Sequence, residues 1–220
     1  MAGLMEIDGP RQAPASGGDP KQLVILLHGL GADGDDLIGL APHWAQILPD
    51  AAFAAPNAPF PCDMAPYGYQ WFSVQDRSPE AMLAGVQGAA STLNAFIDSE
   101  LARTGLGADK LALVGFSQGT MMSLYVAPRR EAPVVAVVGY SGRLIAPERL
   151  NEETVSRPPV LLIHGIEDDL VPFASMAEAE TGLQGAGFTV ESEARPGLGH
   201  GIDPEGLTRA SNFLREKFGL

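Results

Sequence analysis

Four runs of consecutive apolar residues recur along the chain, and within them apolar and polar residues do not alternate. They cover residues 23–27, 111–114, 134–138 and 160–163, and residues 51–55 form a weaker fifth run. Short runs of this kind are typical of strands that are buried on both faces of a parallel sheet. Because helices must cover both faces of such a sheet, the runs predict an α/β fold.

The segments between these runs carry helix signals. Ser78 followed by Pro79 is typical of an N-cap and a first helical position, and Thr104-Gly105 is typical of a helix end. We therefore expect a helix that runs to about Arg103. Other helices are expected over residues 117–127, 172–186 and 203–218, and a last strand over residues 188–194. This alternation predicts a mostly parallel central sheet with helices on both faces.

Length and local composition indicate how the chain is divided. A chain of 220 residues favours one domain, which we place at residues 21–220, with little room for a cap domain. Residues 8–20 are rich in proline, glycine, alanine and serine. We therefore expect residues 1–20 to form a flexible leader or an edge hairpin.

Charge and cysteine content limit the partners and the compartment. The formal net charge of −13 opposes binding to nucleic acid and to anionic membranes. Cys62 is the single cysteine, so no intramolecular disulfide can form. The N-terminus lacks the basic and apolar regions of a secretory signal, and no apolar stretch is long enough to span a bilayer. We expect a cytoplasmic protein without integral membrane association that acts on a small molecule.

The motif with the clearest chemistry is Gly115-Phe116-Ser117-Gln118-Gly119, which lies between an apolar run and a predicted helix. Gly-x-Ser-x-Gly in this context is typical of the nucleophile elbow of an α/β-hydrolase. The elbow needs glycines because the flanking chain passes very close to the serine. A similar segment, residues 139–142, continues with Arg143 instead of a second glycine. We therefore predict Ser117, and not Ser141, as the nucleophile.

A serine nucleophile needs a base and an acid, which follow it in this fold in the order Ser, Asp or Glu, His. Two histidines follow the serine: His164 at the end of an apolar run, and His200 in a glycine-rich loop. A loop histidine reaches the nucleophile more easily, so we prefer His200 as base and keep His164 as the alternative. Asp168 and Asp169 lie between them, and either could hold the proton on Nδ1 of His200.

An oxyanion hole needs two backbone N–H groups near the nucleophile. One is expected from Gln118, and the other from Leu30 in the loop that follows the first apolar run. That loop, residues 29–34, also matches Gly-x-Gly-x-x-Gly, so a dinucleotide-binding protein is an alternative. Against it, Asp50 precedes the next strand instead of ending it.

One long segment, residues 56–75, contains several prolines and a group of aromatic residues. The aromatic residues are Phe60, Tyr67, Tyr69, Trp71 and Phe72. Long aromatic loops in compact domains are often functional, so we expect this one to contribute to a substrate pocket. The alternative is a loop that only packs its own aromatics. Exposed aromatics here could also support a homodimer.

Together these motifs resemble the phospholipase/carboxylesterase family, which includes the acyl-protein thioesterases. The resemblance extends from about residue 23 to residue 218. It rests on residues 28–31, residues 115–119, His164-Gly165 with Asp168 and Val171-Pro172, and Gly199-His200. It implies an α/β-hydrolase fold with Asp168, not Asp169, as the acid and His200 as the base. It also implies that Leu30 and Gln118 form the oxyanion hole and that Trp71 lies near the acyl pocket, where Phe72, Leu30 and Val171 are further candidates.

Three positions depart from the family's usual pattern: Thr120 replaces a glycine, and Ile166 and Ser73 each replace an aspartate. None of them is a catalytic group. The sequence therefore predicts a serine carboxylesterase that forms an acyl-serine intermediate, with thioesters or lysophospholipids as further substrates and with no cofactor or metal. The alternatives are the dinucleotide-binding protein and a hydrolase-fold binding protein without turnover.

Overall fold

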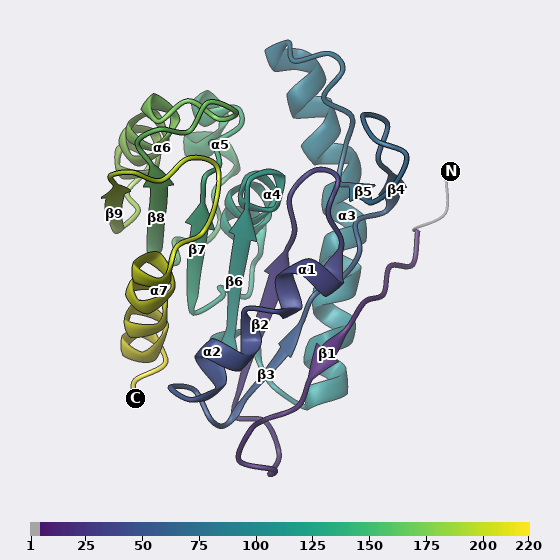
Figure 1. The fold of residues 1–220 in the computed structure, drawn as a ribbon, viewed down its shortest axis with the longest axis vertical. Coiled ribbons are helices and arrows are strands. Elements are labelled where there is room, and N and C mark those ends of the chain that lie inside the picture. Colours follow the sequence, from purple (N-terminus) through teal and green to yellow (C-terminus); the bar gives the residue numbers. More distant parts are fainter. Residues whose placement is uncertain (1–4) are drawn as a thin grey trace.

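The structure, a computed structural model that describes residues 5–220, is built around a central β-sheet (Figure 1). Its strands are β1 (Arg11–Gln12), β2 (Gln22–Leu27), β3 (Ala51–Ala54), β6 (Leu111–Phe116), β7 (Ala136–Tyr140), β8 (Val160–Gly165) and β9 (Val190–Arg195). They lie side by side in the order β1-β3-β2-β6-β7-β8-β9. Strand β1 pairs antiparallel with β3, and all the other neighbours are parallel. The predicted mostly parallel sheet is confirmed.

Helices cover both faces of this sheet. One face carries α1 (Gly34–Ile38), α2 (Ala41–Ala45) and α7 (Pro204–Lys217), and the other carries α3 (Pro79–Thr104), α4 (Gln118–Val126), α5 (Leu150–Glu153) and α6 (Ala174–Gly185). In β2, Leu23, Ile25 and Leu27 belong to the core under α3 and α4. The intervening Val24 and Leu26 belong to the core under α2 and α7. Burial on both faces explains why the apolar runs are unbroken.

The predicted helices are present, with small differences at their ends. Helix α3 begins after the side-chain cap of Ser78 and ends at Gly105, which is left-handed with φ 69°. Helix α4 ends at Val126 and passes into a 3₁₀ turn, Ala127–Arg129. Pro128 fits there because the first residues of a helical turn need no partner for an N–H. The other 3₁₀ turns are Ala108–Lys110 and Pro147–Arg149.

The aromatic segment, residues 56–75, contains a small hairpin that the sequence did not predict. Strands β4 (Phe60–Pro61) and β5 (Tyr69–Gln70) pair antiparallel outside the main sheet. Strands of two residues are too short to produce a periodic pattern. Within the predicted leader, β1 pairs with β3, while residues 1–4 lie outside the described residues. A domain boundary at residue 20 stays a prediction.

No helix within residues 5–220 is both long enough and apolar enough to cross a membrane.

Candidate active site

The nucleophile elbow lies between β6 and α4, at the edge where the parallel strands end. Ser117 has φ 53° and ψ −113°, a conformation that residues with side chains rarely adopt. Its N–H donates to the carbonyl of Tyr140 (2.8 Å), which ties the turn to the neighbouring strand. A Cβ atom on Gly119 would lie 1.9 Å from the oxygen of Leu27, and one on Gly115 would lie 2.3 Å from the backbone of Gly119. The two glycines are therefore required sterically.

Thr120, where the family often has glycine, is accommodated by two glycines next to it. A Cβ atom on Gly139 or Gly142 would lie 2.6 or 2.3 Å from the threonine side chain. The Thr120 hydroxyl lies 2.8 Å from the carbonyl oxygens of both Gly115 and Tyr140. The threonine thus occupies space that smaller neighbours leave free, and it links β6 to β7.

Asp168 and His200 come from different loops and meet at the same edge of the sheet. Asp168 follows β8, and His200 follows β9. Nδ1 of His200 lies 2.7 Å from Oδ2 of Asp168. The other carboxylate oxygen, Oδ1, accepts from the N–H groups of Leu170 (2.9 Å) and Val171 (2.8 Å). Both oxygens of the acid therefore have donors, and the carboxylate is fixed in one orientation.

Burial and hydrogen bonding act on Asp168 in opposite directions. Burial alone raises its pKa, but the hydrogen bonds from His200 and from the N–H groups of Val171 and Leu170 lower it. The net pKa lies below the ordinary value of 3.8. Asp168 is therefore ionised at neutral pH, so that Nδ1 of His200 carries the proton of their hydrogen bond.

His200 packs beside the predicted nucleophile elbow. Its ring lies 4.9 Å, centroid to centroid, from the ring of Phe116, the residue that precedes Ser117. The base loop approaches the end of β8 closely, since a Cβ atom on Gly165 would lie 2.2 Å from the oxygen of Leu198. Within residues 5–220, Nε2 of His200 makes no hydrogen bond, so it is available to the nucleophile.

The other candidates for acid, base and nucleophile occupy different environments. Asp169 is exposed, whereas its neighbour Asp168 is buried. His164 is buried, with 2% of its surface exposed, behind the acid loop. Ser141 has φ 45°, and its buried hydroxyl finds no partner among the described residues.

The loop after β2 lies against the nucleophile. A Cβ atom on Gly29 would lie 3.2 Å from Cβ of Ser117. The backbone N–H groups of Leu30 and Gln118 donate to no other group within residues 5–220. Two free N–H groups beside a serine are what an oxyanion requires.

The same loop is poorly suited to a dinucleotide. The N-terminus of α1 is capped by the side chain of Asp33, and the N–H of Gly34 donates to Asn57 (2.8 Å). A pyrophosphate would need these N–H groups free. Asp50, the acidic residue considered for a ribose, is paired with Lys21 (2.7 Å) at the opposite end of the strands.

The side chain of Gln118, which sequence reasoning missed, attaches the aromatic segment to the elbow. Its Oε1 accepts from the N–H of Trp71 (2.8 Å), and its Nε2 donates to the carbonyl of Phe72 (2.7 Å). The indole N–H of Trp71 donates to the carbonyl of His28 (3.1 Å). No sequence pattern signals a hydrogen bond across more than forty residues.

The four predicted pocket residues differ in exposure. Trp71 and Phe72 are buried in the core, with 0% and 3% of their surfaces exposed. Val171 is also buried, and Leu30 is half-buried. The exposed apolar side chains of this region lie instead on the β4–β5 hairpin and are Phe60, Met64, Tyr67 and Tyr69. Cys62, on the same hairpin, is a buried free thiol.

Comparisons with known proteins place the chain in a family. Residues 13–218 match the family described as Phospholipase/Carboxylesterase. Esterase YpfH of Escherichia coli is 32% identical over 89% of this chain and 82% of its own length. The crystal structure of esterase PE8 is 44% identical, with a TM-score of 0.91 over 96% of this chain and 99% of that chain. Acyl-protein thioesterase 1 of Gibberella zeae is 26% identical over 88% of this chain and 89% of its own length.

The family match spans nearly the whole chain, and the sheet carries a serine elbow, an aspartate and a histidine at one edge in the expected order. The chain therefore belongs to the phospholipase/carboxylesterase family of α/β-hydrolases.

Proposed function

We propose that this ester hydrolase cleaves carboxylic esters by a two-step mechanism in which the acyl group is carried on Ser117. The observation that carries the proposal is the fixed Asp168–His200 pair (2.7 Å), which is held next to a strained serine elbow. A serine hydroxyl is a weak nucleophile until a base removes its proton. Nε2 of His200 is the base, and Asp168 fixes the tautomer that leaves Nε2 unprotonated.

In the first step, Oγ of Ser117 attacks the ester carbonyl carbon while Nε2 of His200 takes the hydroxyl proton. The negative charge that develops on the carbonyl oxygen is received by the N–H groups of Leu30 and Gln118. The N-terminal end of α4, a helix of nine residues, adds a favourable dipole at the same place. Collapse of the tetrahedral intermediate breaks the C–O bond, and the protonated His200 gives its proton to the leaving alcohol.

In the second step, water replaces the alcohol. His200 takes a proton from water, the resulting hydroxide adds to the acyl-Ser117 carbonyl, and the carboxylic acid leaves as the proton returns to Oγ of the serine. Asp168 remains ionised throughout and stabilises the imidazolium in both steps. Each proton transfer in this scheme passes through Nε2 of His200, and the backbone N–H groups only donate hydrogen bonds to the oxyanion.

The substrate class that we propose is a carboxylic ester with an apolar acyl group. Relatives named esterases are 44% and 32% identical to this chain, whereas relatives named acyl-protein thioesterases are 26% and 28% identical. The hairpin is bound to the oxyanion loop, since the N–H of Gly31 donates to Tyr69 (2.9 Å) and the N–H of Tyr69 donates to Ala32 (2.8 Å). The acyl group then rests on the apolar side chains of the hairpin, and Trp71 and Phe72 follow the hairpin in the chain and lie in the core.

The proposal is tested with p-nitrophenyl esters of increasing acyl length, assayed with the parent protein and Ser117→Ala. We expect the variant to lose about 10⁴-fold or more in kcat. A fluorophosphonate probe should label the parent on the peptide that contains Ser117. Activity retained by the variant, or labelling elsewhere, contradicts the mechanism. An S-acyl thioester series, run in parallel, separates ester from thioester preference.

Two further proposals concern location and assembly. We propose a cytoplasmic enzyme, because a single cysteine suits a reducing compartment. The exposed hairpin residues Phe60, Met64 and Tyr67 offer an apolar surface for a homodimer. Light scattering after gel filtration tests the dimer. A measured mass of 23.1 kDa at micromolar concentration, which is the mass of one chain, would contradict it.

A further inference from the structure

His164 is a buried histidine that the proposed mechanism does not use. It lies near the end of β8, four residues before the acid Asp168. Its Nε2 atom lies 2.9 Å from the carbonyl oxygen of Val171. Because a carbonyl oxygen only accepts, Nε2 carries a proton and donates it there. The tautomer of His164 is therefore fixed by the acid loop.

The same nitrogen faces the carboxylate. Nε2 of His164 lies 3.2 Å from Oδ2 of Asp168, the oxygen that accepts from His200. The peptide of Val171 is held at both ends, because its carbonyl accepts from His164 while its N–H donates to Oδ1 of Asp168 (2.8 Å). The imidazole thus contacts the carboxylate directly and also fixes one of the N–H groups that orient it.

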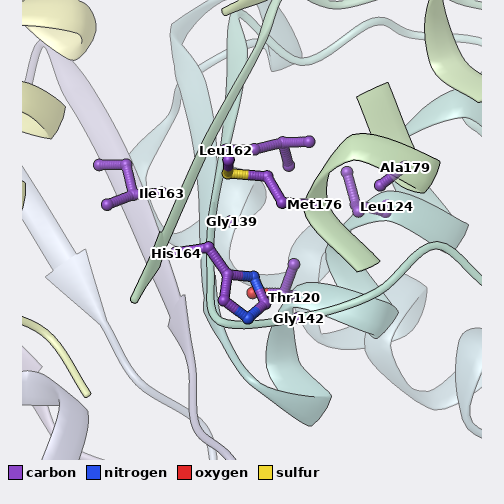
Figure 2. Close-up of a pocket in the computed structure, with 9 residues that line it drawn as sticks. All are labelled: Thr120, Leu124, Gly139, Gly142, Leu162, Ile163, His164, Met176 and Ala179. Atoms are coloured by element: carbon purple, nitrogen blue, oxygen red, sulfur yellow. The ribbon is translucent and has the colours of Figure 1, made fainter. Parts of the chain in front are cut away.

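Figure 2 shows the surroundings of this ring, which lines a small cavity of about 10 Å³ between β7, β8, α4 and α6. Apolar and small residues form most of the lining. Met176 on α6 and Thr120 at the start of α4 also line it. The ring of Phe173 meets the imidazole edge-on, with 6.0 Å between the ring centroids. His164 is therefore enclosed, and its hydrogen bond to Val171 connects it to the acid loop.

We propose that His164 is a positioning residue, which acts through Asp168 to hold the acid–base pair in its productive geometry. This inference rests on the catalytic roles proposed above for Ser117, Asp168 and His200. Nε2–H of His164 holds the Val171 peptide, the N–H of that peptide holds Oδ1, and Nε2 lies 3.2 Å from Oδ2, so the carboxylate keeps the orientation that faces His200. A displacement of about 1 Å in such a pair costs up to about 100-fold in rate. Substrate binding does not involve His164, so KM is unaffected.

The test compares His164→Leu, His164→Asn and His164→Gln in the ester assay. Leucine removes the donor, and asparagine is too short to reach the Val171 carbonyl. Glutamine places an amide N–H near the position of Nε2, where the adjoining cavity gives it room. We expect kcat to fall about 10- to 100-fold in the first two variants, with KM within about 2-fold of the parent. Glutamine should restore most of the lost kcat.

The split between kcat and KM supplies a readout that a purely structural role would not give. Misalignment of the acid–base pair lowers kcat alone, whereas a general distortion of the site also weakens substrate binding and raises KM. Met176→Leu is the matched control, because it changes the lining of the same cavity without touching Asp168. The control should keep the kcat and the KM of the parent.

Three outcomes overturn the positioning role. The first is parental kcat in His164→Asn with a normal melting temperature. The second is equal loss of activity in the Gln and Leu variants, which shows that an N–H donor at this position does not hold the acid–base pair. The third is equal loss in Met176→Leu, which indicates that packing alone matters. Loss of kcat in Ser117→Ala with no effect at His164 rejects only this inference, whereas full activity in Ser117→Ala rejects the mechanism itself.

Discussion

The dipeptide His-Gly occurs at the ends of two strands of the sheet, as His28-Gly29 after β2 and as His164-Gly165 in β8. The two copies have different hydrogen-bond partners. Both histidines are buried, with 0% and 2% of their surfaces exposed. Nε2 of His28 accepts from the N–H of Ala58 (2.9 Å), whereas Nε2 of His164 donates to a carbonyl. The two rings therefore hold opposite tautomers, each set by the loop that it supports.

The two glycines differ in the same way. Gly29 allows the oxyanion loop to lie against Ser117, and Gly165 allows the end of β8 to lie against the loop that carries His200. In the proposed mechanism, the first strand end presents uncharged N–H groups to Ser117, and the second presents the carboxylate of Asp168 to His200. The same dipeptide can therefore support either the oxyanion side or the acid side of the proposed site, depending on whether a carboxylate lies beside its histidine.

Removing the charge at the second strand end should have the largest effect. We expect Asp168→Asn to lower kcat about 10⁴-fold with little change in KM, because an amide at this place favours the wrong tautomer of His200. Ester hydrolysis and KM measured together check this. Asp169→Asn is the matched control and should keep parental activity, since its side chain is exposed. Equal losses in the two variants would contradict the assignment of the acid.

Substitution of the glycine at each strand end should lower kcat by a smaller factor. In Gly165→Ala the new Cβ meets the backbone oxygen of Leu198 at 2.2 Å, so the His200 loop has to move, and kcat should fall about 100-fold. In Gly29→Ala the new Cβ meets side-chain atoms of Phe116 and Ser117 at 3.1 and 3.2 Å. Those contacts are relieved by small shifts, so we expect about a 10-fold loss. A larger loss of kcat in Gly29→Ala than in Gly165→Ala would contradict this prediction.

Sequence reasoning predicted most of the sheet because its strands are buried on both faces. The runs at residues 23–27 and 160–163 need no knowledge of neighbours to be recognised. Strand β7 was placed two residues early, since Val134 and Val135 are apolar but precede the ladder that begins at Ala136. The hairpin was missed because turn contacts, and not periodicity, determine strands of two residues.

The residues of the proposed site also fall into two groups, those that the sequence predicts and those that only packing reveals. Chain order and loop position singled out Ser117 and His200, whereas the choice between Asp168 and Asp169 needed a family resemblance. The structure shows why local sequence could not decide: the N–H groups of Leu170 and Val171 turn one carboxylate inward and leave its neighbour exposed. The supporting roles of His164 and Gln118 depend on contacts that form only when distant segments pack together.

Gln118 gives the oxyanion side its own support, comparable to that of His164 on the acid side. Gln118→Met should leave the N–H of Trp71 and the carbonyl of Phe72 buried and unpaired, at a cost of about 2–4 kcal/mol in the free energy of unfolding. Chemical denaturation measures this. Ser123→Ala is the control, because its hydroxyl bonds only within α4, to Gly119 (3.0 Å). Equal stability of the two variants would show that the two hydrogen bonds of the Gln118 side chain do not stabilise the fold.

The smallest effect concerns protonation of the first strand-end histidine. Burial lowers the pKa of His28 below its ordinary value of 6.5, so the unfolded chain binds this proton more readily than the folded one. The stability associated with neutral His28 is complete above pH 6.5 and is lost as the pH falls from 6.5 toward the lowered pKa. One such group contributes a slope of at most about 1.4 kcal/mol per pH unit.

His28→Gln isolates this slope, because the glutamine oxygen can still accept from Ala58 N–H but does not titrate. We expect the free energy of unfolding to fall less steeply between pH 6.5 and about 5 in the variant than in the parent. Asp168, whose pKa lies below 3.8, affects stability only at lower pH, so it does not contribute in this window. His43→Gln, at an exposed position, should retain the parental slope. If His28→Gln also retains the parental slope, burial of the neutral His28 ring does not contribute to the pH dependence of stability, and the prediction is wrong.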